Sequence, residues 1–249
     1  MMLSEKAGPV PNLEATRGLM GSAVLALWGN ADPEMEEGFN DWYTHEHLPE
    51  RIGIPGFLRA RRYVSCPSDE RAAYSKYFTL YEVQTIEILM SEAYITMLNN
   101  PTPLTRRFLP MFRRMSRTAC TVTYSKARGM GGNAALVEFG PKPGEENRLR
   151  NWVVSSLASN NMTRSGCLAV HFCEVADIAT DIARNVEAYK NLPPTNGRWI
   201  VMIEGGWPDP ATALEDHLRD IEGLEENGAL PDYSCGMYRL LVCLAAGDM

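Results

Sequence analysis

The pattern of apolar and polar positions predicts four strands and two helices in the first half of the chain. The strands are apolar or β-branched runs at Ser22–Gly29, Phe57–Ser65, Tyr74–Val83 and Thr118–Ser125. The first helix follows Asp32-Pro33 and continues from Glu34 to His47, where apolar residues recur at three- and four-residue steps. Leu48 precedes Pro49 and is disfavoured in the α region, so this helix is expected to end near His47. A second helix covers about Ile86 to Leu98.

The same order of elements, β-α-β-β-α-β, returns after the glycine-rich linker Gly129-Met-Gly-Gly132. The second half has strand-like runs at Ala134–Phe139, Cys167–Val175, Trp199–Ile203 and Tyr233–Ala245, helical patterns at Glu145–Ala158 and Ala211–Leu224, and an enlarged connection at Asp177–Tyr189. A βαββαβ unit forms a four-stranded antiparallel sheet with both helices on one face, so its other face needs a cover. A second copy of the unit supplies that cover.

The sequence therefore predicts an α+β fold of two tandem ferredoxin-like repeats whose antiparallel sheets pack as one α+β barrel. Residues 1–20 are expected to form an N-terminal extension. The first repeat is expected at residues 21–129 and a second, diverged repeat at residues 133–249.

Charge and composition narrow the class of partner. The net charge of −7 and the pI near 5.2 argue against a nucleic-acid or anionic membrane surface. No run approaches the ~20 apolar residues that cross a bilayer. The six cysteines have neither CxxC nor zinc spacing, so we expect reduced thiols in a cytoplasmic protein. Motifs for nucleotide binding, serine hydrolases and zincins are absent, and we expect neither a metal nor a cofactor.

The segment Asn40–Arg51 holds the densest group of chemically active side chains. His45 and His47 lie two positions apart on the predicted helix and point in different directions, so a shared metal is not expected. His47 flanks the buried face one turn after Tyr43, whereas His45 lies on the solvated side. The partial negative charge of a helix C-terminus would raise the pKa of His47 and let it exchange a proton near neutral pH. The alternative is a structural histidine that binds the last helical carbonyls or Glu50.

Residues on the predicted strands are candidates for contacting a ligand. Arg62 and Tyr63 point to opposite faces of the second strand, so only one of them can line a cavity. Tyr81 shares a face of the third strand with Tyr77 and Thr79, where aromatic rings and hydroxyls would suit a flat substrate. Ordinary sheet packing is the alternative for this group.

The second half contributes one further histidine. Alternation along its strand lets His171 enter the barrel interior, although a hydrogen-bonded core histidine is the commoner role. Glu82 and Glu204 lie at equivalent strand ends in the two halves. Each could orient a histidine, and each could instead form a salt bridge with an arginine.

Several motifs carry a resemblance to a known family. They are Phe39-Asn-Asp-Trp-Tyr43, Glu46-His-Leu-Pro-Glu-Arg51, Ile54-Pro-Gly-Phe57 and Ala60-Arg-Arg-Tyr63. This segment resembles the helix and second strand of the EthD-like group within the dimeric α+β barrel superfamily. The resemblance covers about residues 22–125, and only the order of elements extends it to the second half. It implies a barrel of two ferredoxin-like units, usually from two chains and here from two halves of one.

The resemblance also implies a role for His47, because such families use this position for acid–base work or ligand contact. The corresponding helix of the second half reads Asn151-Trp-Val-Val-Ser-Ser and has no histidine. One principal pocket is therefore expected, formed by the first repeat's helix end and walled by the second repeat. The superfamily includes cofactor-free monooxygenases, cyclases, isomerases and haem-using enzymes, so function does not follow from the fold.

The leading hypothesis is a cofactor-independent enzyme acting on a small apolar, cyclic or aromatic metabolite. The reaction would be acid–base chemistry, as in an isomerase, cyclase or lyase, or oxygen insertion. His47 would be the general acid/base, and the substrate contacts would be Tyr43, Arg62, Tyr81 and His171. The alternative is a non-catalytic small-molecule-binding or assembly module, and a third hypothesis is haem bound by His171 or His47. A homodimer is also expected from the resemblance.

Overall fold

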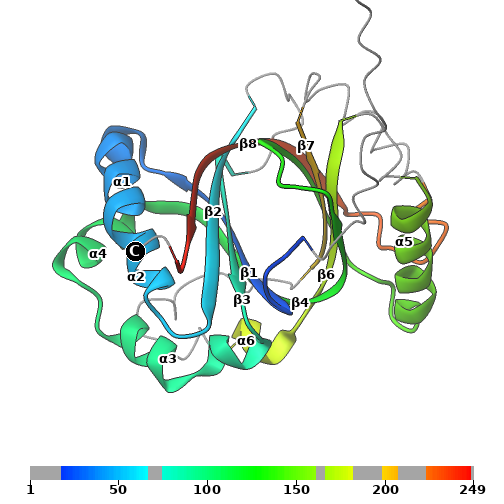
Figure 1. Ribbon diagram of the computed structural model, residues 1–249, viewed down its shortest axis with the longest axis horizontal. Helices are drawn as coiled ribbons and strands as arrows, with labels where there is room; N and C mark the ends of the chain where they lie inside the picture. Colours follow the sequence, from blue (N-terminus) through cyan, green and yellow to red (C-terminus); the bar gives the residue numbers. More distant parts are fainter. Residues whose placement is uncertain (1–17, 67–74, 161–165, 182–197, 207–222, 248–249) are drawn as a thin grey trace, which may run out of the picture.

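In the computed structural model, eight antiparallel strands close into a barrel with the helices on its outside (Figure 1). The structure describes residues 18–66, 75–160, 166–181, 198–206 and 223–247. The strands are β1 (Ala23–Ala31), β2 (Phe57–Ser65), β3 (Tyr77–Val83), β4 (Phe112–Ala127), β5 (Asn133–Phe139), β6 (Cys167–Val175), β7 (Trp199–Gly205) and β8 (Ser234–Ala245).

The strand order is the same in the two halves of the chain. Around the barrel it is β1-β3-β2-β8-β5-β7-β6-β4, so the first half contributes β4-β1-β3-β2 and the second half contributes β8-β5-β7-β6. These two orders are equivalent, and the sheets join through the β2–β8 and β4–β6 pairs. The predicted fold class is confirmed. The residue bounds of the two repeats stay a prediction, and residues 1–17 of the expected extension lie outside the described residues.

The helices of the first half and α5 lie on opposite sides of the barrel (Figure 1). They are α1 (Glu36–Trp42), α2 (Leu48–Ile52), α3 (Glu92–Asn99), α4 (Pro103–Phe108), α5 (Glu146–Asn160) and α6 (Asp177–Asp181). Short 3-10 turns cover Pro33–Met35, Ile86–Met90 and Leu109–Met111, and a π-helical turn covers Tyr43–His47. Within the described ranges no helix is long and apolar enough to span a membrane. Residues 211–222 of the helix predicted at 211–224 and most of the connection at 177–189 lie outside these ranges.

The expectation that the first helix ends near His47 is wrong. The backbone continues through the π-helical turn, where the Leu48 N–H donates to the carbonyl of Tyr43, five residues earlier. Pro49 then occupies the first turn of α2, where its missing N–H matters least. A wider π turn before Pro49 lets the chain remain helical, which a rule based on α-helical geometry alone does not foresee.

The barrel wall separates three apolar regions. The first helix–sheet layer lies between the helices of the first half and the outer faces of β1–β4, and includes Phe39, Trp42, Tyr43, Phe57, Tyr77, Tyr81 and Phe108. The second helix–sheet layer lies under α5 and includes Phe139, Leu149, Val153, Phe172 and Trp199. The barrel interior includes Val24, Trp28, Tyr63, Phe78, Leu136, Met202 and Tyr238.

Candidate functional site in the first helix–sheet layer

His47 lies in the first helix–sheet layer and is almost fully buried. Its ring packs against Trp42 and Tyr43, with ring centroids 4.7 and 4.8 Å apart. Only 4% of the residue is exposed, and its Nδ1 atom is buried with no hydrogen-bond partner among the described residues. This nitrogen caps no helical carbonyl and does not bond to Glu50. It is therefore a buried hydrogen-bonding atom whose capacity is unused by the described residues.

The environment of His47 keeps the imidazole neutral. Burial lowers the pKa of His47 well below its ordinary value, and the charges of Arg51 and Arg62 lower it further. The expected rise in this pKa is wrong, because the helix does not end at His47 and the ring is shielded from solvent. A neutral imidazole at neutral pH has a lone pair that can accept a proton.

Arg62 approaches the same place from β2 and is held between two tyrosine rings. Its guanidinium carbon lies 4.3 Å from the ring centroids of both Tyr43 and Tyr77. Its Nη2 donates a hydrogen bond of 2.7 Å to the side-chain oxygen of Asn40. The Nε atom of Arg62 is buried without a partner in the described part of the chain. The layer thus contains a fixed positive charge with a donor to spare.

Tyr81 and Tyr43 add two phenol groups. The Tyr81 hydroxyl donates to the Tyr43 hydroxyl at 3.5 Å, and both residues are buried. Burial raises the pKa of Tyr81 well above its ordinary value, so the group is a neutral phenol at physiological pH. The predicted sharing of one face by Tyr77 and Tyr81 is confirmed, because both lie in this layer.

Helix α4 covers the layer and is tied to the His47 helix by side-chain hydrogen bonds. Thr105 accepts a bond of 3.3 Å from the Trp42 indole N–H and donates one of 3.4 Å to Glu50. Thr102 caps α4 and donates to Glu46. Sequence reasoning missed these contacts, although Thr102-Pro103 is a recognisable helix start.

The structure brings four of the five predicted site residues together. His47, Tyr43, Arg62 and Tyr81 share the first layer, whereas His171 lies on the other face of the barrel wall. There its Nε2 is 2.9 Å from Oε1 of Glu204, and it is 1% exposed. The second half of the chain reaches the layer through α6, where Ala179 is buried in it, and through β8, where Val242 and Leu244 pack against its edge. The first repeat therefore supplies the polar groups of the site.

Comparisons with known proteins extend to the fold alone. No family model and no curated protein matches this sequence. An anthrone oxidase-like protein matches with a TM-score of 0.60 and 10% identity, over 90% of this chain and 93% of that one. A candidate monooxygenase from Fusobacterium nucleatum matches with a TM-score of 0.57 and 9% identity, over 91% and 96%. A candidate chlorite dismutase matches with a TM-score of 0.50 and 10% identity, over 91% and 96%.

The chain has the dimeric α+β barrel fold. At about one identical residue in ten, these neighbours share the barrel without identifying a substrate or a catalytic residue. The dimeric α+β barrel is formed here within one chain, because both sheets come from the same 249 residues. The evidence for a function therefore lies in the side chains of this chain.

Proposed function

We propose that the chain is an enzyme that binds a small, flat, weakly acidic ring compound in the first helix–sheet layer and removes a proton from it with His47. One observation carries the proposal. The buried Nδ1 of His47 has no partner among the described residues, and Arg62 lies close enough for its charge to act on the imidazole. A neutral base beside a fixed cation can take a proton and stabilise the anion that remains.

The proton affinity of His47 would change as the substrate loses its proton. Without substrate, the charges of Arg51 and Arg62 oppose protonation of His47. Once the substrate becomes an anion next to Arg62, its negative charge offsets those cations and the imidazolium becomes more stable. This coupling favours a substrate whose carbon or hydroxyl proton is already acidic. The phenols of Tyr43 and Tyr81 would donate to the same developing anion.

We further infer that the substrate anion reacts with molecular oxygen. The anthrone oxidase-like and monooxygenase-type structural neighbours support this choice. In balanced form, one ring methylene and one O2 give one ring carbonyl and one water, and the protein contributes the proton transfers. Rearrangement of the same anion, as in an isomerase, cyclase or lyase, would use the same residues. The EthD-like relationship belongs to this proposal, since it rests on the His47 helix.

The histidines that the structure describes do not fit a haem ligand. Both ring nitrogens of His171 have partners, since Nδ1 lies 3.0 Å from Ser125 Oγ and Nε2 lies beside Glu204. His45 is on the surface and pairs with Asp41. The ring of His47 is covered by Trp42 and Tyr43. We therefore propose chemistry without haem, and a Soret band in the purified protein would contradict it.

The test is oxygen uptake by the wild type and His47→Gln with anthrone-type tricycles and naphthols. Loss of the general base should lower the rate about 100- to 10,000-fold. The circular dichroism spectrum should be unchanged. His45→Gln is the matched control, because this exposed histidine lies in the same π-helical turn and should keep the full rate.

Other outcomes separate the alternatives. Conversion of a substrate without oxygen uptake, still dependent on His47, would favour the isomerase, cyclase or lyase reaction. Binding without any conversion would favour the non-catalytic module. A fully active His47→Gln protein would remove His47 from the mechanism.

A further inference from the structure

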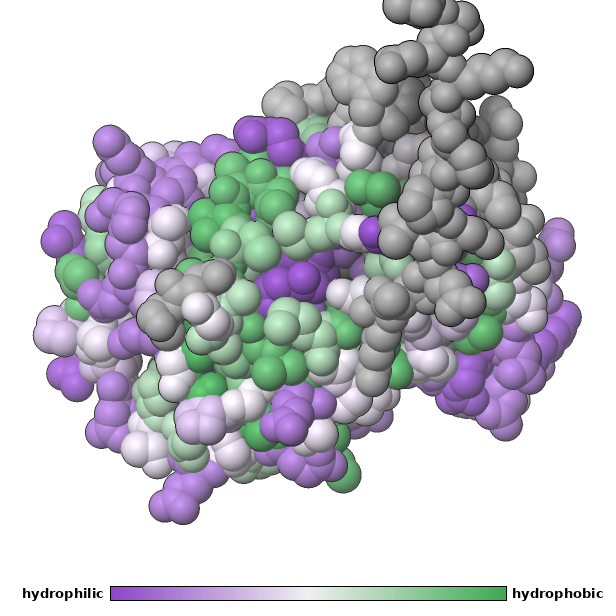
Figure 2. Space-filling view, viewed as in Figure 1, coloured by the Kyte–Doolittle hydropathy of each residue, from purple (hydrophilic) through white to green (hydrophobic). Residues whose placement is uncertain are grey.

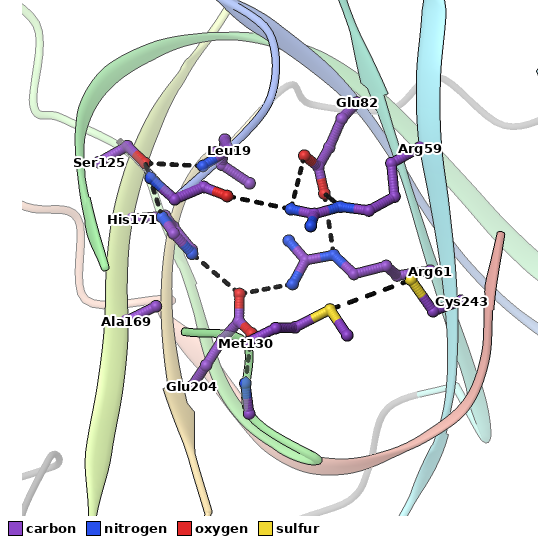
Figure 3. A network of polar contacts seen from close by, with 12 residues as sticks. Leu19, Arg59, Arg61, Glu82, Ser125, Met130, Ala169, His171, Glu204 and Cys243 are labelled. Atoms are coloured by element: carbon purple, nitrogen blue, oxygen red, sulfur yellow. Dashed lines mark hydrogen bonds and ion pairs between the residues drawn. The ribbon is translucent and has the colours of Figure 1, made fainter. Parts of the chain in front are cut away.

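Strands of both halves of the chain send charged side chains into the barrel interior (Figure 3). Arg59 Nε lies 2.8 Å and Arg61 Nε 2.9 Å from Oε1 of Glu82. Arg61 Nη1 reaches Oε1 of Glu204, in the second repeat, at 2.5 Å. Burial alone would raise the pKa of Glu204, but the hydrogen bond from His171 and the charge of Arg61 lower it to about 2. The two guanidinium cations of Arg59 and Arg61 thus face the two carboxylates of Glu82 and Glu204.

The hydrogen bonds also place the proton on His171. Ser125 Oγ accepts bonds from the backbone N–H groups of Gly18 and Leu19, at 3.2 and 3.1 Å. With both lone pairs used, its own hydrogen points to His171 Nδ1 at 3.0 Å. The proton of the neutral ring then lies on Nε2 and is donated to Glu204. When His171 is neutral, the network has no net charge.

The carboxylate oxygens of this network all have donors. Besides the arginines and His171, Met20 N–H donates to Oε2 of Glu82 and Gly131 N–H donates to Oε2 of Glu204. Two donors remain. Arg61 Nη2 and the Tyr63 hydroxyl are buried, with no partner among the described residues. Both residues are fully buried and project from the same face of β2 into the interior.

The backbone of Gly18 and Leu19 borders the network at one end of the barrel. Leu19 places its side chain in the barrel interior, while Gly18 accepts a 3.0 Å bond from Arg59 Nη2 through its carbonyl. Figure 2 shows hydrophilic residues recessed at the centre of the barrel within a ring of hydrophobic ones.

We propose that the barrel interior is a second binding site, in which Arg61 Nη2 and the Tyr63 hydroxyl donate to the carbonyl oxygen of a small uncharged ring compound. A ligand that carries an acceptor atom would satisfy both of these donors. The balanced charge of the network favours an uncharged ligand, because an added anion would leave the buried network with excess negative charge. The rings of Tyr63 and Phe78 offer an apolar surface beside the donors. This site is independent of the function proposed for His47.

The experiment uses acetophenone labelled with ¹³C at its carbonyl as the probe, followed by infrared difference spectroscopy. Donation by Tyr63 and Arg61 should move the carbonyl stretch of the bound probe below its frequency in water. Tyr63→Phe should raise the Kd about tenfold, the effect of one ordinary hydrogen bond, and reduce that shift. Its Tm should equal or exceed that of the wild type, because the removed hydroxyl has no partner in the free protein.

Tyr238→Phe is the matched control inside the same barrel. The Tyr238 hydroxyl donates to the carbonyl of Ser75 at 3.1 Å, so its loss should lower the Tm and leave probe binding unchanged. The proposal is overturned if the wild type does not bind the probe up to its solubility limit. It is also overturned if Tyr63→Phe binds with the same affinity and the same carbonyl shift. Loss of binding in His47→Gln with full binding in Tyr63→Phe would place the probe in the first layer and would equally refute it.

Discussion

The two helix–sheet layers rest on equivalent sheets but contain different chemistry. The first buries His47 and Arg62, each with a nitrogen that has no partner among the described residues. The second is packed around Phe139, Phe172 and Trp199, and no buried histidine, arginine, lysine or carboxylate occurs in its described part. A buried polar atom without a partner costs stability, so a layer that only had to hold a helix would not need one. This difference supports the proposal that the first layer binds a ligand, whereas the second layer packs α5 on its sheet.

The largest expected effect is a difference in the free energy of unfolding between a variant of the second layer and a variant of the first. Phe172 stacks on Phe139 and meets Trp199 edge-on, at centroid distances of 6.2 and 5.4 Å. Phe172→Ala should therefore lower the free energy of unfolding by about 3–5 kcal/mol. His47→Leu removes a buried unpaired nitrogen from the first layer, so it should change stability by no more than about 1 kcal/mol while abolishing turnover.

Urea unfolding monitored by circular dichroism measures both variants. Equal losses of several kcal/mol would show that His47 is a core residue like Phe172, and the contrast between the layers would fail.

Strand patterns were sufficient to predict the fold, because alternation and the repeated order of elements depend on local sequence. Cys167–Val175 is a strand over its full predicted length, and Glu82 and Glu204 fall at equivalent strand ends that meet on Arg61. The assignment of Arg62 and Tyr63 to opposite faces also holds, with Arg62 in the first layer and Tyr63 in the barrel interior. Period-two geometry leaves few alternatives at such positions.

The chemistry of His47 could not be predicted in the same way. Its pKa depends on Arg51, one turn along a helix that was expected to have ended, and on Arg62 from another strand. The spare donors of Arg61 and Tyr63 were equally hidden, because a missing partner is a property of the folded interior. Sequence patterns give the direction of a side chain, and only the packed structure shows what it meets there.

The pH dependence of stability offers a second, smaller contrast. The pKa of His47 in the folded protein is well below its value of about 6.5 in the unfolded chain. Between these two pKa values the unfolded state binds a proton at His47 and the folded state does not. The free energy of unfolding therefore rises with pH across this interval. The contribution of His47 to the free energy of unfolding is complete above about pH 6.5. It is lost as the pH falls, with a limiting slope of about 1.4 kcal/mol per pH unit.

Unfolding curves between about pH 5 and 7.5 test this for the wild type and His47→Gln. The difference between the two proteins should grow toward low pH. A difference that is constant with pH would mean that His47 does not titrate in this interval.

The smallest effect on stability is expected at Arg62, where several contributions oppose one another. Arg62→Met removes the ring contacts with Tyr43 and Tyr77 and the bond to Asn40, but it also removes a buried charge with an unpaired Nε. The free energy of unfolding should change by only about 1–2 kcal/mol. The pKa of His47 should rise, because one of the two cations that oppose its protonation is gone.

Histidine side-chain NMR titration measures that pKa directly in Arg62→Met and in a control, Arg113→Met. Arg113 is half-exposed and pairs with Asp32 at 2.7 Å, so its replacement should leave His47 unchanged. An unchanged His47 pKa in Arg62→Met would break the electrostatic coupling on which the proposed proton transfer depends. A rise confined to Arg62→Met would show that the charge in the first layer sets the basicity of its histidine, for which the described part of the second layer has no counterpart.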